Sequence, residues 1–368
     1  MRVKDIAEAL EAWAPPWVAW ERDNVGLQVG NGQALGRRIL LALDVTEAVV
    51  REAVRRRVQL IVSHHPLLFR PPKTIVDSNP VGRLVLSLAE QKIAVYSAHT
   101  NLDFIRDGVS FTLAQALGVQ QVRFLSPLKD LLAKLIVFVP AAHVNSVRTA
   151  MARAGAGRIG EYDECSFEIF GHGTFKGSQD SRPVVGARGQ LERIDEVRLE
   201  MVLPRARVRD VVDAMKRAHP YDEVAYDVFL LDNESPNYGS GAVGTLERHL
   251  TLSAFLRRVR TQLKANVVRY VGNPRATIKT VVVCGGSGSE LLNDAIRAHA
   301  DAFVTADVRY HTFHEADGRI ALIDAGHWET EHVVLPEMKK RLLRAASARK
   351  EHLEIMISRT PTNPIHST

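Results

Sequence analysis

RILLALDVTEAVVREAVRRRVQLIVSHH (38–65) is the stretch that most clearly indicates the fold, because it holds two apolar runs on either side of an amphipathic pattern. Such a pattern predicts two buried, parallel strands joined by a helix. A weaker copy, TVVVCGGSGSELLNDAIRAHADAFVTAD (280–307), follows at an offset of 242, with Ala53 aligned to Ala295 and Val62 to Val304. A further apolar run follows each copy. The outer parts of the chain are therefore expected to form two similar α/β halves with mainly parallel sheets.

A sharper repeat lies between these two copies. LIVFVPAAHVNSVRTAMARA (135–154) and LEMVLPRARVRDVVDAMKRA (199–218) share nine identities in twenty positions. Each copy has the pattern strand, proline, helix, and a second strand follows each. Two such units in tandem predict a ferredoxin-like α+β sandwich. We therefore expect an inserted domain at 129–235, between α/β halves at 1–128 and 236–368 that together form one domain.

Composition favours a soluble, cytoplasmic protein. The chain has 368 residues, of which 46% are hydrophobic, enough for two or three domains. Two cysteines cannot build a disulfide framework. The first residues, MRVKDIAEALEAWAPP, have the pattern of an amphipathic helix and lack the apolar core of a signal peptide. No apolar stretch approaches the roughly 18 residues of a membrane span, so no membrane partner is expected.

The net charge of +6 permits binding to nucleic acid or to phosphorylated small molecules. The basic clusters are short, and each lies in a helical pattern, which favours solvated helix faces: Arg55–Arg57, Arg257–Arg258 and Lys339–Arg341. Aromatic residues make up only 6% and do not alternate with basic ones as they do in a stacking platform. Nucleic-acid binding therefore remains an alternative supported by charge alone.

Polar side chains able to bind a metal follow four of the expected strands. They are Ser63, His64 and His65; His99, Asn101 and Asp103; Asp307, Tyr310 and His311; and Asp324, His327, Glu329 and Glu331. The carboxyl ends of parallel strands meet at one edge of a sheet, where ligands bind. A lone histidine is more often a hydrogen-bonded polar residue than a ligand, but four such strand ends favour a metal site. His327 and Glu331 are four apart, so they share a face if that segment is helical.

The glycine-rich stretch CGGSGSEL (284–291) has two interpretations. Its backbone amides could cradle a phosphate, or it could be a tight turn between a strand and a helix. The stretch lacks the complete P-loop and dinucleotide-binding signatures. GSGAVGTL (239–246) is similarly ambiguous.

Five motifs resemble one known family, the dinuclear-metal, hexameric GTP cyclohydrolase 1 type 2 homologues, also called Nif-three-like proteins. They are DNVGLQVG (23–30), SHHPLLF (63–69), AHTNLD (98–103), CGGSGSEL (284–291) and DAGHWETE (324–331). GRIGEYDECSF (157–167) and AHPYDEVAYD (218–227) look like the PII/CutA-like insert of longer members. The resemblance covers nearly the whole chain and implies a fold of two α/β halves.

The resemblance also implies a metal centre. Its ligands would be His64, His65, Asp103, His327 and Glu331, holding two divalent metal ions per subunit. Zinc, iron, manganese, cobalt and nickel all suit such ligands. Six chains would form a toroidal homohexamer. One departure is RDGVS (106–110), which puts Ser110 where relatives have asparagine in a Gly-Gly-Val-Asn run.

The implied activity is metal-dependent hydrolysis of a nucleotide, in which an activated water attacks the guanine ring and formate leaves. His99 or His311 could then move protons as catalytic groups, although either could instead support the ligands. Two alternatives remain open. The substrate could be another phosphorylated or cyclic-amide compound, or the protein could be a non-catalytic, regulatory metal-binding hexamer whose insert senses a ligand or partner.

Overall fold

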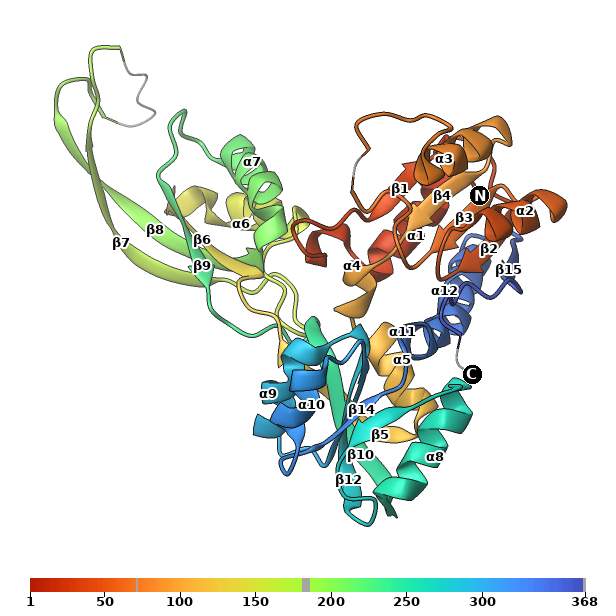
Figure 1. Ribbon diagram of the computed structural model, residues 1–368. Helices are drawn as coiled ribbons and strands as arrows, with labels where there is room; N and C mark the ends of the chain where they lie inside the picture. The colour runs from red at the N-terminus through yellow and green to blue at the C-terminus, as the bar shows by residue number, and fades with distance from the viewer. Residues whose placement is uncertain (71, 181–185, 367–368) are drawn as a thin grey trace. The chain divides into compact units, whose positions relative to one another are not determined.

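The chain folds into two compact units, which are described separately (Figure 1). The computed structural model describes residues 1–70, 72–180 and 186–366. The first unit combines Met1–Pro127 with Asn237–Thr368, and the second, called the insert below, is Leu128–Pro236. Within the described residues, no helix is long and apolar enough to cross a membrane.

The first unit contains two sheets, the first of which has five strands. Their order is β1 (Gly26–Val29), β4 (Ala94–Ser97), β3 (Leu60–Ser63), β2 (Arg38–Ala42) and β15 (Glu354–Ile357). All neighbours pair in parallel except β1, which is antiparallel to β4. Successive side chains of β2 point to opposite faces, where Leu41 and Leu40 enter different cores. Helices cover both faces, so β2, β3 and β4 are apolar on both sides.

The second sheet has six strands. Their order is β11 (Arg269–Val271), β14 (Ala321–Asp324), β13 (Ala302–Ala306), β12 (Thr277–Ser287), β10 (Gly239–Thr251) and β5 (Val119–Pro127). The central strands β12, β13 and β14 are parallel, like β2, β3 and β4. Together the two sheets confirm the predicted α/β class with mainly parallel cores.

The two halves of the first unit exchange strands. β5 precedes the insert in the chain but pairs with β10 in the second sheet. β15, near the end of the chain, pairs in parallel with β2 in the first sheet. Each sheet therefore draws on both outer segments, and neither half is contiguous in sequence.

Helices pack on both faces of each sheet. The first sheet is covered by α1 (Val3–Trp13) and α12 (Leu335–Ala348) on one face and by α2 (Glu47–Arg55) and α3 (Pro80–Glu90) on the other. The second sheet lies between α5 (Val109–Ala116) with α8 (Leu252–Leu263) and α9 (Leu292–Arg297) with α10 (Tyr310–Ala316). Two short helices carry site residues: α4 (Thr100–Asp103) and α11 (His327–Glu331). Single 3-10 turns are η1 (Pro16–Val18), η4 (Ser289–Leu291) and η5 (His332–Val334).

The insert has the strand order expected of a ferredoxin-like sandwich. Its antiparallel sheet runs β7 (Phe167–Lys176), β8 (Leu191–Pro204), β6 (Leu132–Pro140) and β9 (Tyr226–Leu231). The helices α6 (Val144–Arg153) and α7 (Val208–Ala218) follow the 3-10 turns η2 (Ala141–His143) and η3 (Arg205–Arg207) and pack on one face of this sheet. The first residues of α6 and α7 lie 64 positions apart in the chain, as the repeat predicts.

Candidate metal centre

The paired histidines continue the line of β3 beyond its last residue. The backbone amide of His64 donates to Ala42 and that of His65 to Leu43, so both remain fixed against the chain that leaves β2. The Nδ1 atom of His64 lies 2.8 Å from the carbonyl oxygen of Ala98, and the His64 side chain is fully buried. The two imidazole centroids are 5.0 Å apart, so both rings reach one small region.

The end of β4 supplies two more side chains. His99 approaches His64 with a ring separation of 5.2 Å. Its Nδ1 atom lies 3.0 Å from the carboxylate of Asp23, which also accepts a hydrogen bond from the backbone amide of Thr100. Asp103, on α4, places Oδ1 3.6 Å from Nε2 of His64.

The second sheet completes the cluster through α11, which follows β14. His327 and Glu331 share a face of this helix, with His327 Nε2 3.2 Å from Glu331 Oε1. The other carboxylate oxygen of Glu331 lies 3.0 Å from His65 Nε2. The site thus joins residues from the ends of strands in both sheets of the first unit.

Three imidazoles are oriented in the same way, by a carboxylate at Nδ1. Asp44 lies 2.7 Å from His65, Asp23 lies 3.0 Å from His99, and Asp307 lies 2.6 Å from His327. A carboxylate at Nδ1 leaves Nε2 available, and histidine ligands of metals are held in this manner. The candidate ligand atoms of His64, His65 and His99 lie within 4.8 Å of one another, as do those of His65, His327 and Glu331.

Unpartnered buried atoms indicate that these residues fit a metal ion. His64 Nε2 and Asp103 Oδ1 are both buried without a hydrogen-bond partner. An unpaired buried polar atom costs free energy, and a metal ion bound to both atoms would supply the missing partner. The available donors are imidazole nitrogen and carboxylate oxygen without thiolate, a set that suits divalent transition metals.

The charged side chains at the centre shift one another's pKa values. Burial raises the pKa of Asp103 to about 7, and the nearby Glu331 contributes to the same shift. Burial alone would raise the pKa of Glu331 too, but the surrounding histidines hold it well below its ordinary range.

Burial would lower the pKa of His65, yet the carboxylates of Asp44 and Glu331 raise it to about 10. In the same way Glu331 and Asp307 raise the pKa of His327 to about 9, against the effect of burial. Without a metal these imidazoles hold protons, which a metal ion must displace to bind.

The glycine-rich stretch forms a wall of this site. Gly285 and Gly286 belong to β12, and a Cβ atom on Gly286 would lie 2.2 Å from Glu331 Oε1 and 3.2 Å from His327 Nε2. Gly286 also has φ +62°, a conformation that favours glycine. The first two glycines of CGGSGSEL therefore allow α11 to approach β12 closely, a role that the sequence did not suggest.

The structure brings six of the seven proposed site residues together: His64, His65, His99, Asp103, His327 and Glu331. The seventh, His311, lies exposed on α10 with its ring against Tyr310. Among the described residues it belongs to neither group of converging ligand atoms.

Sequence reasoning missed the residues that orient the imidazoles. Asp44 comes after β2, so the rule that selected His64 at the end of β3 would also have found it. Asp23 lies inside the DNVGLQVG motif, and Asp307 is among the strand-end residues able to bind a metal, although the sequence does not indicate that it orients His327.

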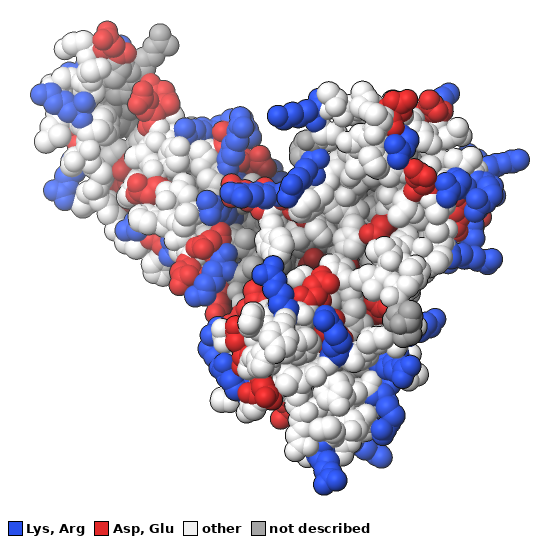
Figure 2. Space-filling view, viewed as in Figure 1, with Lys and Arg blue, Asp and Glu red and all other residues white. Residues whose placement is uncertain are grey.

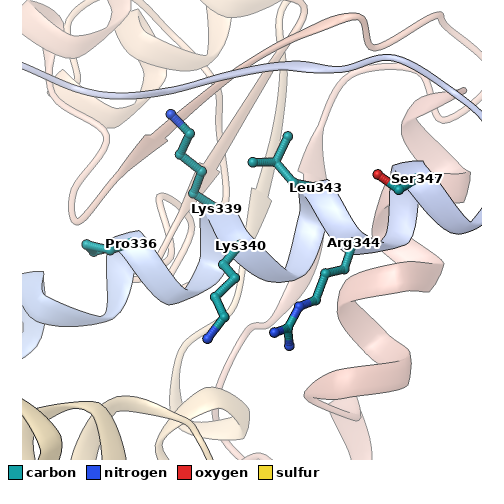
Figure 3. Close-up of a pocket in the computed structure, with 6 residues that line it drawn as sticks. All are labelled: Pro336, Lys339, Lys340, Leu343, Arg344 and Ser347. Atoms are coloured by element: carbon teal, nitrogen blue, oxygen red, sulfur yellow. The ribbon is translucent and has the colours of Figure 1, made fainter.

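Two hollows lie elsewhere. One of about 510 Å³ runs along α12, where Lys339 and Leu343 project to one side and Lys340 and Arg344 to the other (Figure 3). A larger one, of about 950 Å³, lies in the insert beside β7 and β8. No residue of the metal centre lines either hollow. On the face shown in Figure 2, lysine and arginine are interspersed with aspartate and glutamate and do not form one continuous stripe.

Fold and site together define a mixed α/β protein with histidine and glutamate clusters able to bind metal ions. The chain belongs to the Duf34/NIF3 (NGG1p interacting factor 3) family, whose model matches residues 1–364. This confirms the resemblance that the five motifs carry.

Relatives match over almost their whole length. The chain is 39% identical over 363 residues to a Bacillus subtilis protein named GTP cyclohydrolase 1 type 2 homolog, covering 98% of this chain and 97% of the relative. A Mycobacterium leprae protein of the same name is 39% identical over 336 residues, covering 90% and 87%. Among solved structures, a Bacillus cereus protein related to NIF3 superposes with a TM-score of 0.82 at 38% identity, covering 100% of this chain and 99% of the other.

Proposed function

We propose that this protein is a dinuclear metal-dependent hydrolase that acts on a nucleotide. One observation carries the proposal: His65, His99 and His327 each have a carboxylate at Nδ1, which leaves their Nε2 atoms for another partner. The names of the curated relatives, GTP cyclohydrolase 1 type 2 homolog, support GTP as the substrate. Hydrolysis of the guanine ring with release of formate is what the family resemblance implies.

In this proposal two divalent ions are held by the five ligands His64, His65, Asp103, His327 and Glu331. Glu331 would contribute both of its carboxylate oxygens to holding the ions, because one lies 3.2 Å from His327 Nε2 and the other 3.0 Å from His65 Nε2. Bound divalent ions lower the pKa of a coordinated water and polarise the substrate. Zinc, iron, manganese, cobalt and nickel all fit this ligand set.

Proton transfer is assigned to His99. Its Nδ1 atom is held by Asp23, and burial, which would raise the pKa of that carboxyl, is outweighed by hydrogen bonds from His99 and Thr100 that lower it to about 2. Asp23 therefore stays ionised and keeps the His99 ring in place. His311 is left without this role, since it lies exposed on α10.

We propose the oligomeric state and the cellular location from the family resemblance and the composition. The protein is a cytoplasmic, toroidal homohexamer that binds a small-molecule nucleotide. Light scattering of the purified protein tests the hexamer. Nucleic-acid binding would rest on the net charge of +6 alone, and an affinity for DNA without salt dependence would remove that support.

The metal centre is tested with His64→Ala and His327→Ala, with His311→Ala as the matched control. We expect the first two variants to lose bound metal in elemental analysis while their circular dichroism stays that of the wild type. The control should keep its metal, because His311 lies outside the cluster. Full metal content in His64→Ala and His327→Ala would refute the site.

The activity is tested by incubating metal-loaded protein with GTP and a panel of other nucleotides. Turnover that rises with metal content is the expected result. Saturable nucleotide binding without turnover would overturn the hydrolase and favour the regulatory alternative, in which the insert senses a ligand or partner.

A further inference from the structure

The motif DNVGLQVG (23–30) lies beside the candidate metal centre, although the proposed function uses only its first residue. It includes β1, which pairs with β4, the strand that leads to His99. The carboxylate of Asp23 orients the His99 ring. It also accepts a hydrogen bond from the backbone amide of Asn24, at 2.8 Å. The other polar side chains of the motif are therefore placed close to His99.

Asn24 and Gln28 hold the backbone of Leu68 from two sides. Asn24 Nδ2 donates to the carbonyl oxygen of Leu68 at 2.6 Å, and the Leu68 amide donates to Gln28 Oε1 at 2.8 Å. Gln28 Nε2 also donates to the carbonyl oxygen of Asn24, at 2.5 Å, which links the two residues to each other. These bonds fix the backbone within 64–70, a stretch that forms neither a helix nor a strand.

Phe69 directly follows Leu68 and lies against His99. The two ring centroids are 6.1 Å apart, and the ring planes are nearly perpendicular, at 85°. Phe69 nevertheless remains 52% exposed. A single exposed apolar side chain is common on protein surfaces. This one differs because it contacts an imidazole of the metal centre and because two side-chain amides hold the backbone beside it.

An exposed phenyl ring in this place can bind a flat ligand. Aromatic side chains stack on nucleobases of every kind, because each base has a π-face. The His99 ring contacts Phe69 and also the rings of His64 and His65, at 5.2 and 5.6 Å between centroids. The proposed function assigns proton transfer to His99, so a substrate that reaches His99 also reaches Phe69.

We propose that Phe69 is a specificity-determining residue that stacks against the base of a nucleotide at the metal centre, and that Asn24 and Gln28 hold it in position. This inference rests on the nucleotide substrate of the proposed function but not on hydrolysis. Phe69 has no ligand atom, so the metal content should not depend on it.

Three variants of Phe69 separate a stacking ring from a merely apolar side chain. Phe69→Ala removes the ring, Phe69→Leu keeps an apolar side chain without a flat face, and Phe69→Trp keeps a flat ring. Phe229→Ala is the matched control, because Phe229 is 53% exposed but lies on β9 of the insert, which holds none of the metal-centre residues. Each full-length variant is loaded with zinc and checked by elemental analysis. Isothermal titration calorimetry then measures its affinity for GTP.

We expect Phe69→Ala to bind GTP about 5- to 100-fold more weakly, the range that corresponds to stacking of one base. Phe69→Leu should show most of this loss, and Phe69→Trp should bind GTP as the wild type does. Phe229→Ala should keep the wild-type affinity, and zinc content should be the same in all variants. Wild-type affinity in Phe69→Leu would overturn the inference, as would an equal loss in Phe229→Ala or a loss of zinc from Phe69→Ala.

Gln28→Leu tests the residues that hold Phe69. It removes both hydrogen bonds of the Gln28 amide, so GTP should bind severalfold more weakly while zinc is retained. Wild-type GTP affinity in this variant would overturn the positioning role.

The same measurements distinguish this inference from the proposed function. If the wild type binds GTP without turnover, hydrolysis alone fails and the affinities still decide the role of Phe69. If the wild type hydrolyses GTP and Phe69→Ala binds it equally well, the role of Phe69 alone fails. A wild type that binds zinc but no nucleotide would overturn both the substrate and the stacking role.

Discussion

At the scale of single residues, the candidate metal centre depends on side chains that lack a partner and on glycines that leave room. His64 Nε2 and Asp103 Oδ1 are buried without hydrogen bonds, and the other ring nitrogen of His64 lies 2.8 Å from the carbonyl oxygen of Ala98. Gly286 keeps open the space into which Glu331 projects. A methyl group there would compete with the carboxylate for the same volume.

Gly286→Ala is therefore expected to reduce metal binding as well as stability. The alanine would carry both the cost of a positive φ, about 1 kcal/mol, and a contact of 2.2 Å with Glu331 Oε1. Gly318→Ala is the control, since Gly318 has φ +71° and nothing within 4 Å of an added Cβ. Elemental analysis and thermal melting of both variants separate the effects. Equal metal content in the two variants would contradict the steric role of Gly286.

At the scale of elements, a buried carboxylate on α2 holds the segment that follows β15. Burial would raise the pKa of Glu52, but hydrogen bonds from Ser358, Arg359 and Thr360 lower it to about 2. The ordinary value is 4.5, so the ionised carboxylate stabilises the folded state above that pH. This contribution is lost as the pH falls from about 5 toward 2.

Glu52→Gln is expected to lower the free energy of unfolding at neutral pH by about 1–3 kcal/mol. The deficit should shrink in acid, because below about pH 4.5 the Glu52 carboxylate of the unfolded wild-type chain becomes protonated while that of the folded chain stays ionised down to about pH 2. Urea unfolding at about pH 7 and about pH 3 measures both. Glu47→Gln, on the exposed side of α2, should change little at either pH. A deficit that stays constant with pH would show that the Glu52 charge is not what holds the segment.

At the scale of the whole molecule, the insert interrupts the first unit between two neighbouring strands. Pro127 of β5 pairs with Gly239 of β10, and Ser126 pairs with Ser240. The chain thus leaves and re-enters the first unit at adjacent positions of one antiparallel ladder. Such a site tolerates exchange of the intervening sequence for a short turn.

Replacing 128–236 with an Asn-Gly turn is therefore expected to leave a folded first unit. Its metal content should equal that of the full chain, because no metal-centre residue lies in the insert. Circular dichroism and elemental analysis check this, with the full-length protein as reference. A soluble, folded product without metal would mean that the insert supports the centre, against our expectation.

The sequence predicts best what depends on neighbours along the chain. The 64-residue repeat predicts that α6 and α7 begin at equivalent positions, and both do. The spacing of His327 and Glu331 predicts a shared helical face, which α11 provides. Each of these patterns follows from the helical or strand period, a property of the local backbone.

Contacts between distant segments needed the folded structure. β15 and β5 each join the sheet of the other half, and apolar periodicity carries no information about which strands will pair. Glu52 and Thr360 are 308 residues apart, yet a hydrogen bond joins their side chains. Such pairs form because burial of both sheet faces imposes one register on the whole unit. That register, and not the local pattern of either segment, brings the ends of strands from two sheets to one candidate metal centre.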